Sequence, residues 1–205
     1  MHLSWLGQTA FKIQTKNADK DIAVLIDPYK PTSGDFPRSI SADLALFSRG
    51  AKDSVALSGE PFILETLGEL ERSGVMMAGF PGPDGTVLFK ITAENISVVH
   101  IGAIHHTLDD ETIEKIGSVD ILLIPAGDTP TYLDIEAAAK LVNTLEPRIV
   151  IPFAYRCDSD ESAKPVEPFL KELGLKPEGT EKKLVIKAKD LPQEEMKVWI
   201  LEKNV

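Results

Sequence analysis

Cysteine is scarce in this sequence, and long apolar runs and a signal-peptide pattern are absent. The chain contains one cysteine, Cys157, and four histidines in 205 residues. A single cysteine excludes an intrachain disulfide and any metal or redox motif built on paired cysteines. No apolar run approaches the about 18 residues of a membrane-spanning helix, and the first residues show no signal-peptide pattern. We therefore expect a soluble, cytoplasmic protein without a membrane partner.

Positive charge is scarce as well. The 22 Lys and Arg residues are outnumbered by 32 Asp and Glu, which gives a net charge of -10. Such a surface repels phosphate backbones, so we expect no nucleic-acid partner. Neither a glycine-rich phosphate loop nor a serine-histidine-acid pattern is present. With 43% apolar and 26% charged residues, the chain has the composition of an ordinary globular protein, and its length fits a single domain, residues 1–205.

Strand patterns dominate both ends of the chain, and helix patterns lie between them. The apolar stretches 3–15 and 21–29 predict two strands joined by a polar turn at 16–21. Residues 60–74 have apolar side chains at helical spacing, but Gly68 opposes a helix, so both helix and strand remain open there. Further strands are predicted at 42–48, 119–127, 148–155, 182–188 and 196–202, a hairpin at 85–102, and helices at 107–117, 133–147 and 165–174. This order predicts an α/β (α+β) protein with two sheets and helices packed outside them.

Several stretches, in their order and spacing, resemble one known family. They are "LSWLGQTAFKI", "VLIDPY", "SADLALFS", "VVHIGAIHHTLDDETIEKIGSVDILLIPAGDTPTY" and "AAKLVNTLEPRIVIPFAY". Together they resemble the small metallo-β-lactamase-fold hydrolases of the zinc-dependent, lactonase-like subgroup. The resemblance covers residues 3–156 and is weakest over 57–90. It implies a four-layer αββα sandwich with a metal site at the edge of the two sheets.

The resemblance also implies that most metal ligands of the family are missing here. The family binds metal through a His-x-His-x-Asp-His turn, a central histidine, the aspartate of a Gly-Asp pair and a histidine in "IP-x-His-Tyr". The corresponding positions hold Arg49, Ala51, Asp53, Ser54, Ala103 and Ala154, and no histidine lies between His2 and His100. Zinc needs three or four nitrogen, oxygen or sulfur ligands, and Asp53 alone cannot hold it. We therefore expect no metal and no other cofactor, with Arg49 paired to Asp53 in a vestigial site.

Five polar residues are expected near the rim of this site: Asp27, His100, His105, His106 and Asp128. Asp27 precedes a proline and is expected to fix a turn. His100 and His106 match family positions that are not the usual ligands, so a structural or supporting role is expected. Asp128 resembles part of the family's Gly-Asp-Thr stretch but follows the strand after the expected one, which favours a loop carboxylate.

Two functions of different classes follow from these residues. The first is a non-catalytic homologue, a pseudoenzyme with a binding, regulatory or assembly role toward an unidentified protein or small molecule. The alternative is a hydrolase, with zinc held by His105, His106, Asp109 and Asp128, or with Arg49 as a metal-free clamp on a small anionic substrate. An open pocket with convergent polar groups favours the hydrolase, and a plugged cavity favours the pseudoenzyme. A symmetric homo-oligomer could form through exposed outer helices.

Overall fold

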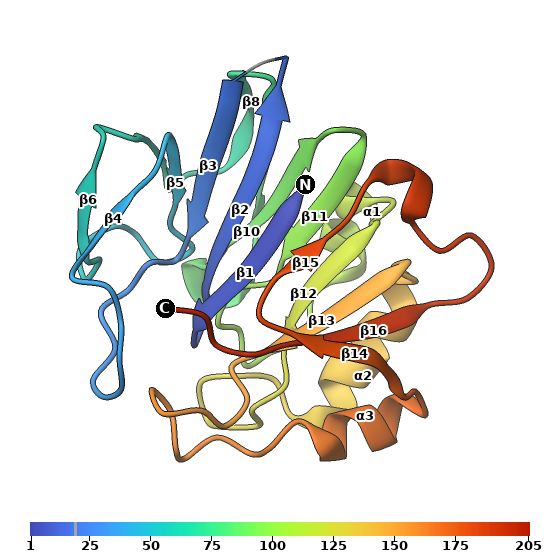
Figure 1. Cartoon of the computed structure of the whole chain (residues 1–205). Coiled ribbons are helices and arrows are strands. Elements are labelled where there is room, and N and C mark those ends of the chain that lie inside the picture. Colours follow the sequence, from blue (N-terminus) through green and yellow to red (C-terminus); the bar gives the residue numbers. More distant parts are fainter. Residues whose placement is uncertain (19) are drawn as a thin grey trace.

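Two β-sheets lie face to face in the computed structural model, which describes residues 1–18 and 20–205 (Figure 1). The six-stranded sheet has the order β15 (Leu184–Val185), β1 (His2–Gly7), β2 (Ala10–Asn17), β3 (Lys20–Ile26), β5 (Leu44–Leu46) and β7 (Phe62–Leu64). The eight-stranded sheet has the order β14 (Pro177–Glu181), β16 (Lys197–Leu201), β13 (Ile149–Phe153), β12 (Ile121–Pro125), β11 (Ile96–His100), β10 (Val87–Ala93), β9 (Val75–Pro81) and β8 (Gly68–Arg72). The predicted sandwich is confirmed.

Both sheets mix antiparallel and parallel pairing. Strands β1, β2 and β3 form an antiparallel meander, whereas β3, β5 and β7 run parallel. In the second sheet β8 to β11 are antiparallel, and β11, β12, β13, β16 and β14 are parallel. Parallel strands with both faces covered are apolar throughout, and all residues of β11, β12 and β13 are buried.

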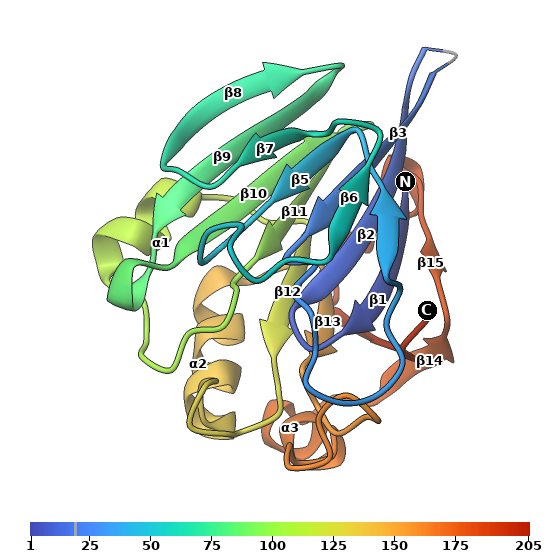
Figure 2. The same cartoon turned by 90° about the vertical axis from the view of Figure 1, so that its left-hand side faces the viewer.

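The helices cover the outer face of the eight-stranded sheet (Figures 1 and 2). They are α1 (Asp110–Ile116), α2 (Ile135–Leu145) and α3 (Glu167–Leu173), and short 3-10 turns occur at η1 (Pro83–Gly85) and η2 (Ala188–Asp190). In the outer layer of the six-stranded sheet lie two short parallel strands, β4 (Ser39–Ser41) and β6 (Ala56–Ser58). Their cluster of Leu6, Ala10, Leu25, Ile40, Ala42 and Val55 covers only part of that face. None of the helices in the described residues is long and apolar enough to cross a membrane.

The structure differs from the predicted elements at several places, and the strands β4, β6, β9 and β14 lie in segments where none was predicted. The single strand predicted over 3–15 is split into β1 and β2, because Gly7 and Gln8 adopt left-handed backbone at φ 112 and 47. For residues 60–74, where helix and strand both remained open, the structure has the strands β7 and β8, and Gly68 has φ 117, which a helix cannot contain. The helix predicted over 107–117 begins later, as α1, because the side chain that caps it belongs to Asp109. The turn predicted over 16–21 joins β2 to β3, and its residue 19 lies outside the described residues.

Left-handed backbone also gathers where strands end along one edge of the sandwich. Non-glycine residues with φ between 45 and 55 follow β1, β3, β9, β12 and β13 at Gln8, Asp27, Asp84, Asp128 and Ala154. The two sheets are tied together here, because Thr9 O accepts from His100 Nε2 at 2.9 Å and Ser159 O accepts from Gln8 Nε2 at 3.1 Å. Such strain costs free energy and clusters at functional sites, so this edge is the place to look for one.

Candidate functional site

The loop after β5 is fixed by a buried carboxyl group. Asp27 is fully buried and accepts hydrogen bonds from Ser48 N at 2.7 Å and from Ser48 Oγ at 2.6 Å. Its own backbone N–H donates to Leu46 O at 2.9 Å, which ties the ends of β3 and β5 together. Asp27 therefore sets the point from which the loop carrying Arg49 leaves the sheet.

Arg49 lies against an aromatic ring and not against Asp53. Its guanidinium carbon is 4.9 Å from the ring centroid of Tyr29, and its backbone N–H donates to the Tyr29 hydroxyl oxygen at 2.9 Å. Burial, followed by the charge of Asp27, raises the pKa of Tyr29 to about 12, so the phenol stays neutral. Among the described residues no ion pair joins Arg49 to Asp53, which is exposed, so the predicted pair is wrong. The Arg49 guanidinium instead makes a cation–π contact with the Tyr29 ring.

An open pocket of about 510 Å³ lies beside Arg49. Its polar lining includes Ser48, Arg49, Glu65, Asp84, His105 and Thr131. These residues follow β5, β7, β9, β11 and β12, several of which are parallel strands. Ligands of α/β sheets commonly bind beyond the carboxyl ends of parallel strands, where loops from separate strands converge. The pocket is thus a candidate binding site by position as well as by lining.

Three potential metal ligands meet beside this pocket, and two of them, Asp84 and His105, also line it. Asp84, His105 and His106 each offer one ligand atom, and these atoms lie within 4.8 Å of one another. His105 Nε2 is 3.4 Å from Asp84 Oδ2, and the two histidine rings are 4.2 Å apart between centroids. Two imidazole nitrogens and one carboxylate oxygen form a donor set typical of catalytic zinc, which keeps a fourth position open. The residues present therefore fit a divalent metal, although all three are exposed.

The other two carboxylates of the sequence-based zinc hypothesis lie elsewhere. Asp109 Oδ1 accepts from Thr112 N at 2.7 Å as the N-cap of α1, and this bond lowers the pKa of Asp109. Asp128 forms an ion pair with Lys164. The carboxylate beside His105 is that of Asp84, which the sequence did not single out. Its signal was the Pro-Asp-Gly turn at 83–85, but only the fold shows that this turn faces the loop after β11.

His100 is a buried residue of the sheet end. It is fully buried, its ring stacks on Phe153 at 5.1 Å between centroids, and its Nδ1 accepts from Gly102 N at 3.1 Å. Since Nδ1 accepts, Nε2 carries the proton and donates to Thr9 O. Both ring nitrogens are thus engaged by backbone groups, which leaves none for a metal.

Burial of His100 predicts a loss of stability in mild acid. Burial lowers the pKa of His100 from 6.5, against opposing effects of Asp27 and Thr9. The folded state therefore binds a proton at His100 less readily than the unfolded state does. The free energy of unfolding has its full value above pH 6.5 and falls as the pH drops below 6.5. Between pH 6.5 and 5.5 we expect the wild type to lose about 1 kcal/mol more than His100→Gln. Urea unfolding at both pH values measures this difference, and equal losses would contradict the prediction.

The residues at the family's ligand positions are dispersed around the pocket. Ala103 lines it, whereas Ala51 donates its N–H to Glu65 Oε2 at 2.9 Å and Ser54 forms a β-bridge with Tyr29. Ala154 is fully buried. The sequence did not single out Tyr132, which is 8% exposed and belongs to the same apolar cluster between the sheets as Ala103 and Ala154. Ala103 and Ala154 were the features of the sequence that could have indicated it. Small residues in a core leave a volume that another side chain must fill.

Comparison with known proteins gives matches over most of the chain. The family model described as the beta-lactamase superfamily domain matches residues 2–154. A metal-dependent hydrolase of Methanosarcina mazei is 25% identical, over 82% of this chain and 91% of that protein. A crystal structure from Thermotoga maritima, described as a zinc-dependent hydrolase of the metallo-β-lactamase superfamily, has a TM-score of 0.81 at 25% identity and covers 98% of each chain. Igni18, a metallo hydrolase of Ignicoccus hospitalis, has a TM-score of 0.65 at 17% identity over 100% of this chain and 96% of that one, which shows the fold alone.

Proposed function

Because the chain belongs to the beta-lactamase superfamily, we propose that it is a metal-dependent hydrolase with a rearranged site, in which Asp84, His105 and His106 hold the metal. The observation that carries the proposal is the convergence of these three ligands beside an open pocket at the strand ends, with Asp84 and His105 in its lining. A divalent metal held there supplies Lewis-acid chemistry for hydrolysis. The relatives described as metal-dependent or zinc-dependent hydrolases support the same class of reaction.

Arg49 selects a small anionic substrate in this proposal. Its guanidinium stays charged at any ordinary pH and is oriented by the Tyr29 ring at 4.9 Å. A planar guanidinium matches the geometry of a carboxylate or phosphate. In this proposal Glu65, which lines the pocket and has one carboxylate oxygen bonded to Ala51 N, accepts a proton from water through the other oxygen. We also propose that the protein works in the cytoplasm, where its single thiol would stay reduced.

Metal titration tests this function. We expect protein purified without a metal-binding tag to take up one Zn²⁺ or Co²⁺ per chain and to melt at a higher temperature with it, since a ligand of the native state stabilises that state. His105→Ala and Asp84→Ala should each weaken binding by about 100-fold or more, because even supporting residues of metal sites cost about 10- to 100-fold. His2→Ala, which removes a histidine far from the pocket, is the matched control.

A second candidate function is the pseudoenzyme, and the burial of Tyr132 favours it. The Tyr132 ring lies in the apolar cluster that contains Ala103 and Ala154, two of the family's ligand positions. Burial, with the charges of Asp160 and Asp27, raises the pKa of Tyr132, and the nearby Arg49 opposes them. In this role the protein binds no stoichiometric metal, a chelator leaves its melting temperature unchanged, and lactone and phosphodiester hydrolysis stays at background with added zinc. These results would contradict the proposal that the protein is a metal-dependent hydrolase.

A further inference from the structure

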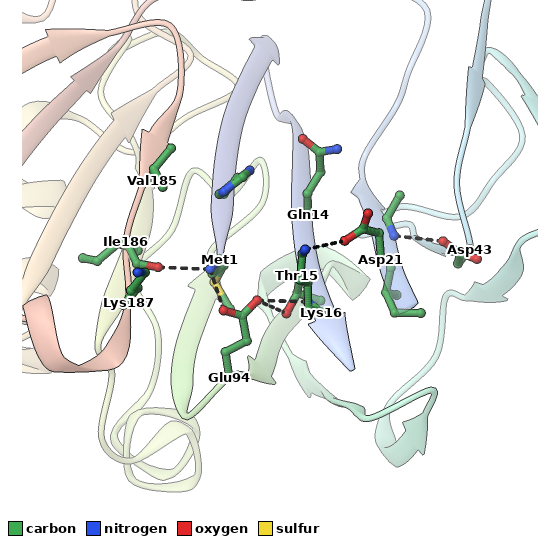
Figure 3. A pocket seen from close by; sticks show the side chains of 13 residues that line it. Met1, Gln14, Thr15, Lys16, Asp21, Asp43, Glu94, Val185, Ile186 and Lys187 are labelled. Atoms are coloured by element: carbon green, nitrogen blue, oxygen red, sulfur yellow. Dashed lines mark hydrogen bonds and ion pairs between the residues drawn. The ribbon is translucent and has the colours of Figure 1, made fainter. Parts of the chain in front are cut away.

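The outer face of the six-stranded sheet is only half covered. Strands β4 and β6 pack over Leu6, Ala10 and Leu25, near the end of the sheet that carries the pocket described above. Over the other half lies a hollow of about 450 Å³. A second hollow of about 420 Å³, which shares Gln14 with the first, lies beside β4 and is lined by Leu6 and Ile40 as well. Figure 3 shows the first of them, between the start of β1, the end of β2 and the residues of β15. The first hollow shares no lining residue with the pocket beside the metal ligands.

The acids in the first hollow are already engaged, as the dashed lines of Figure 3 show. Glu94 accepts from the Met1 amino group and from Thr15 Oγ1, both at 2.7 Å. Asp21 lies 3.5 Å from Lys16 Nζ, and Asp43 accepts from Ala23 N at 2.9 Å. Such an arrangement neutralises the hollow's negative charge internally and does not suit a metal.

Lysines on this face have no such partners. Within residues 1–18 and 20–205, Lys12, Lys183 and Lys187 take part in no ion pair. Lys187 lines the first hollow, and Lys12 and Lys183 line the second. Burial, and after it the charge of Lys183, lowers the pKa of His2, which pairs with Val185 across the two strands. The face is therefore locally cationic on a chain whose net charge is -10.

Strand β15 is an edge of this sheet, and its hydrogen-bonding groups are open on one side. Ile186 exchanges both backbone hydrogen bonds with Met1, each at 3.0 Å. Bonded and non-bonded pairs alternate in antiparallel strands, so the next pair, His2 with Val185, is not hydrogen-bonded. The N–H and C=O of Val185 therefore point away from β1, and no described strand lies on that side. The Val185 side chain is 58% exposed.

The side chains along this edge form a simple pattern. Leu184 and Ile186 are buried, whereas Lys183, Val185 and Lys187 are exposed, as expected for the alternation of an extended chain. One apolar side chain thus lies between two unpaired cations on the open face. The residues that complement this pattern on a neighbouring strand are an apolar residue flanked at two-residue spacing by acids.

We propose that the β15 edge binds an extended acidic segment of a partner protein, which adds a strand beside Val185. Main-chain bonds to the open N–H and C=O of Val185 provide the pairing, as in other cases of strand addition. Carboxylates opposite Lys183 and Lys187 select the partner and fix its register. Charge complementarity favours an acidic partner over a second copy of this chain, whose own edge carries the same lysines.

Fluorescence anisotropy with a labelled Glu-Thr-Val-Thr-Glu peptide tests the proposal. We expect saturable binding that weakens as salt is added, and no binding of a Lys-Thr-Val-Thr-Lys peptide. Lys183→Glu combined with Lys187→Glu should weaken binding at least 10-fold. Val185→Pro removes the outward N–H together with the valine side chain, two of the groups that the added strand would contact, and should weaken binding similarly. Lys140→Glu combined with Lys171→Glu, two exposed positions on α2 and α3, is the charge-matched control and should leave it unchanged.

The same variants separate this proposal from other occupants. Circular dichroism confirms that each is folded, and if Val185→Pro is not, the lysine reversals decide alone. Equal binding of both peptides, or affinity that survives the lysine reversals, overturns the proposal. So does a concentration-dependent dimer, measured by sedimentation, that Val185→Pro abolishes, or lysine-dependent binding of an oligonucleotide or anionic vesicle without binding of the acidic peptide.

Discussion

Replacement of Gly127 by alanine is expected to destabilise the protein by on the order of 3 to 5 kcal/mol, or to prevent folding. A Cβ at this position would lie 2.0 Å from Ala154 O, inside any permitted contact distance. The obstacle is backbone that cannot move cheaply, because Ala126 N donates to Phe153 O and Lys164 N donates to Gly127 O, both at 2.8 Å. The loops after β12 and β13 touch at a point where only hydrogen fits.

Gly174→Ala is the matched control. Gly174 also ends an ordered element, has φ 68 and has nothing within 4 Å of an added Cβ. The change should cost only about 1 kcal/mol, the usual penalty for an alanine in left-handed backbone. Urea unfolding of both variants measures the difference, and similar costs at the two sites would mean that the approach of Gly127 to Ala154 is not tight in solution.

Most elements from residue 85 onward were predictable because their signals are local, and β14 is the strand among them that was missed. Buried strands such as β12 and β13 are apolar runs stopped by proline or glycine, and α2 opens on the capping Asp134. The N-terminal sheet was harder, since Gly7 and Gln8 turn the chain inside what looks like one apolar strand. Edge strand β8 shows no clear alternation, as four of its five residues are exposed. A strand without a buried face leaves no periodic signature.

The site was predictable only in its position. The resemblance placed Arg49, Ala103 and His105 near one edge of the sandwich, and all three line the pocket. What Arg49 contacts depends on Tyr29, whose ring reaches it from another loop. Asp84 joins His105 across a distance of 21 positions in the sequence, so no motif with fixed spacing could have paired them. Contacts between loops of separate strands are set by the fold and are invisible to local patterns.

Asp27→Ala is expected to cost on the order of 3 to 4 kcal/mol. The substitution leaves the buried Ser48 N–H and hydroxyl without the carboxyl oxygens that accept from them at 2.7 and 2.6 Å. An unsatisfied buried donor costs about 1 to 3 kcal/mol by itself. Position 27 also has φ 47, a conformation that aspartate and asparagine tolerate better than alanine. Both penalties act on the turn that carries Arg49 into the pocket.

Asp27→Asn separates these contributions. The amide oxygen can still accept from Ser48 N, the amide nitrogen can donate to a rotated Ser48 hydroxyl, and left-handed backbone remains acceptable, so we expect a cost of about 1 kcal/mol. Ser48→Ala removes the hydroxyl alone, and combined with Asp27→Ala it gives the coupling of the pair in a double-mutant cycle. Urea unfolding measures each term. A loss below about 1 kcal/mol for Asp27→Ala would show that Ser48 finds other acceptors, and that the position of Arg49 is set by the Tyr29 ring instead.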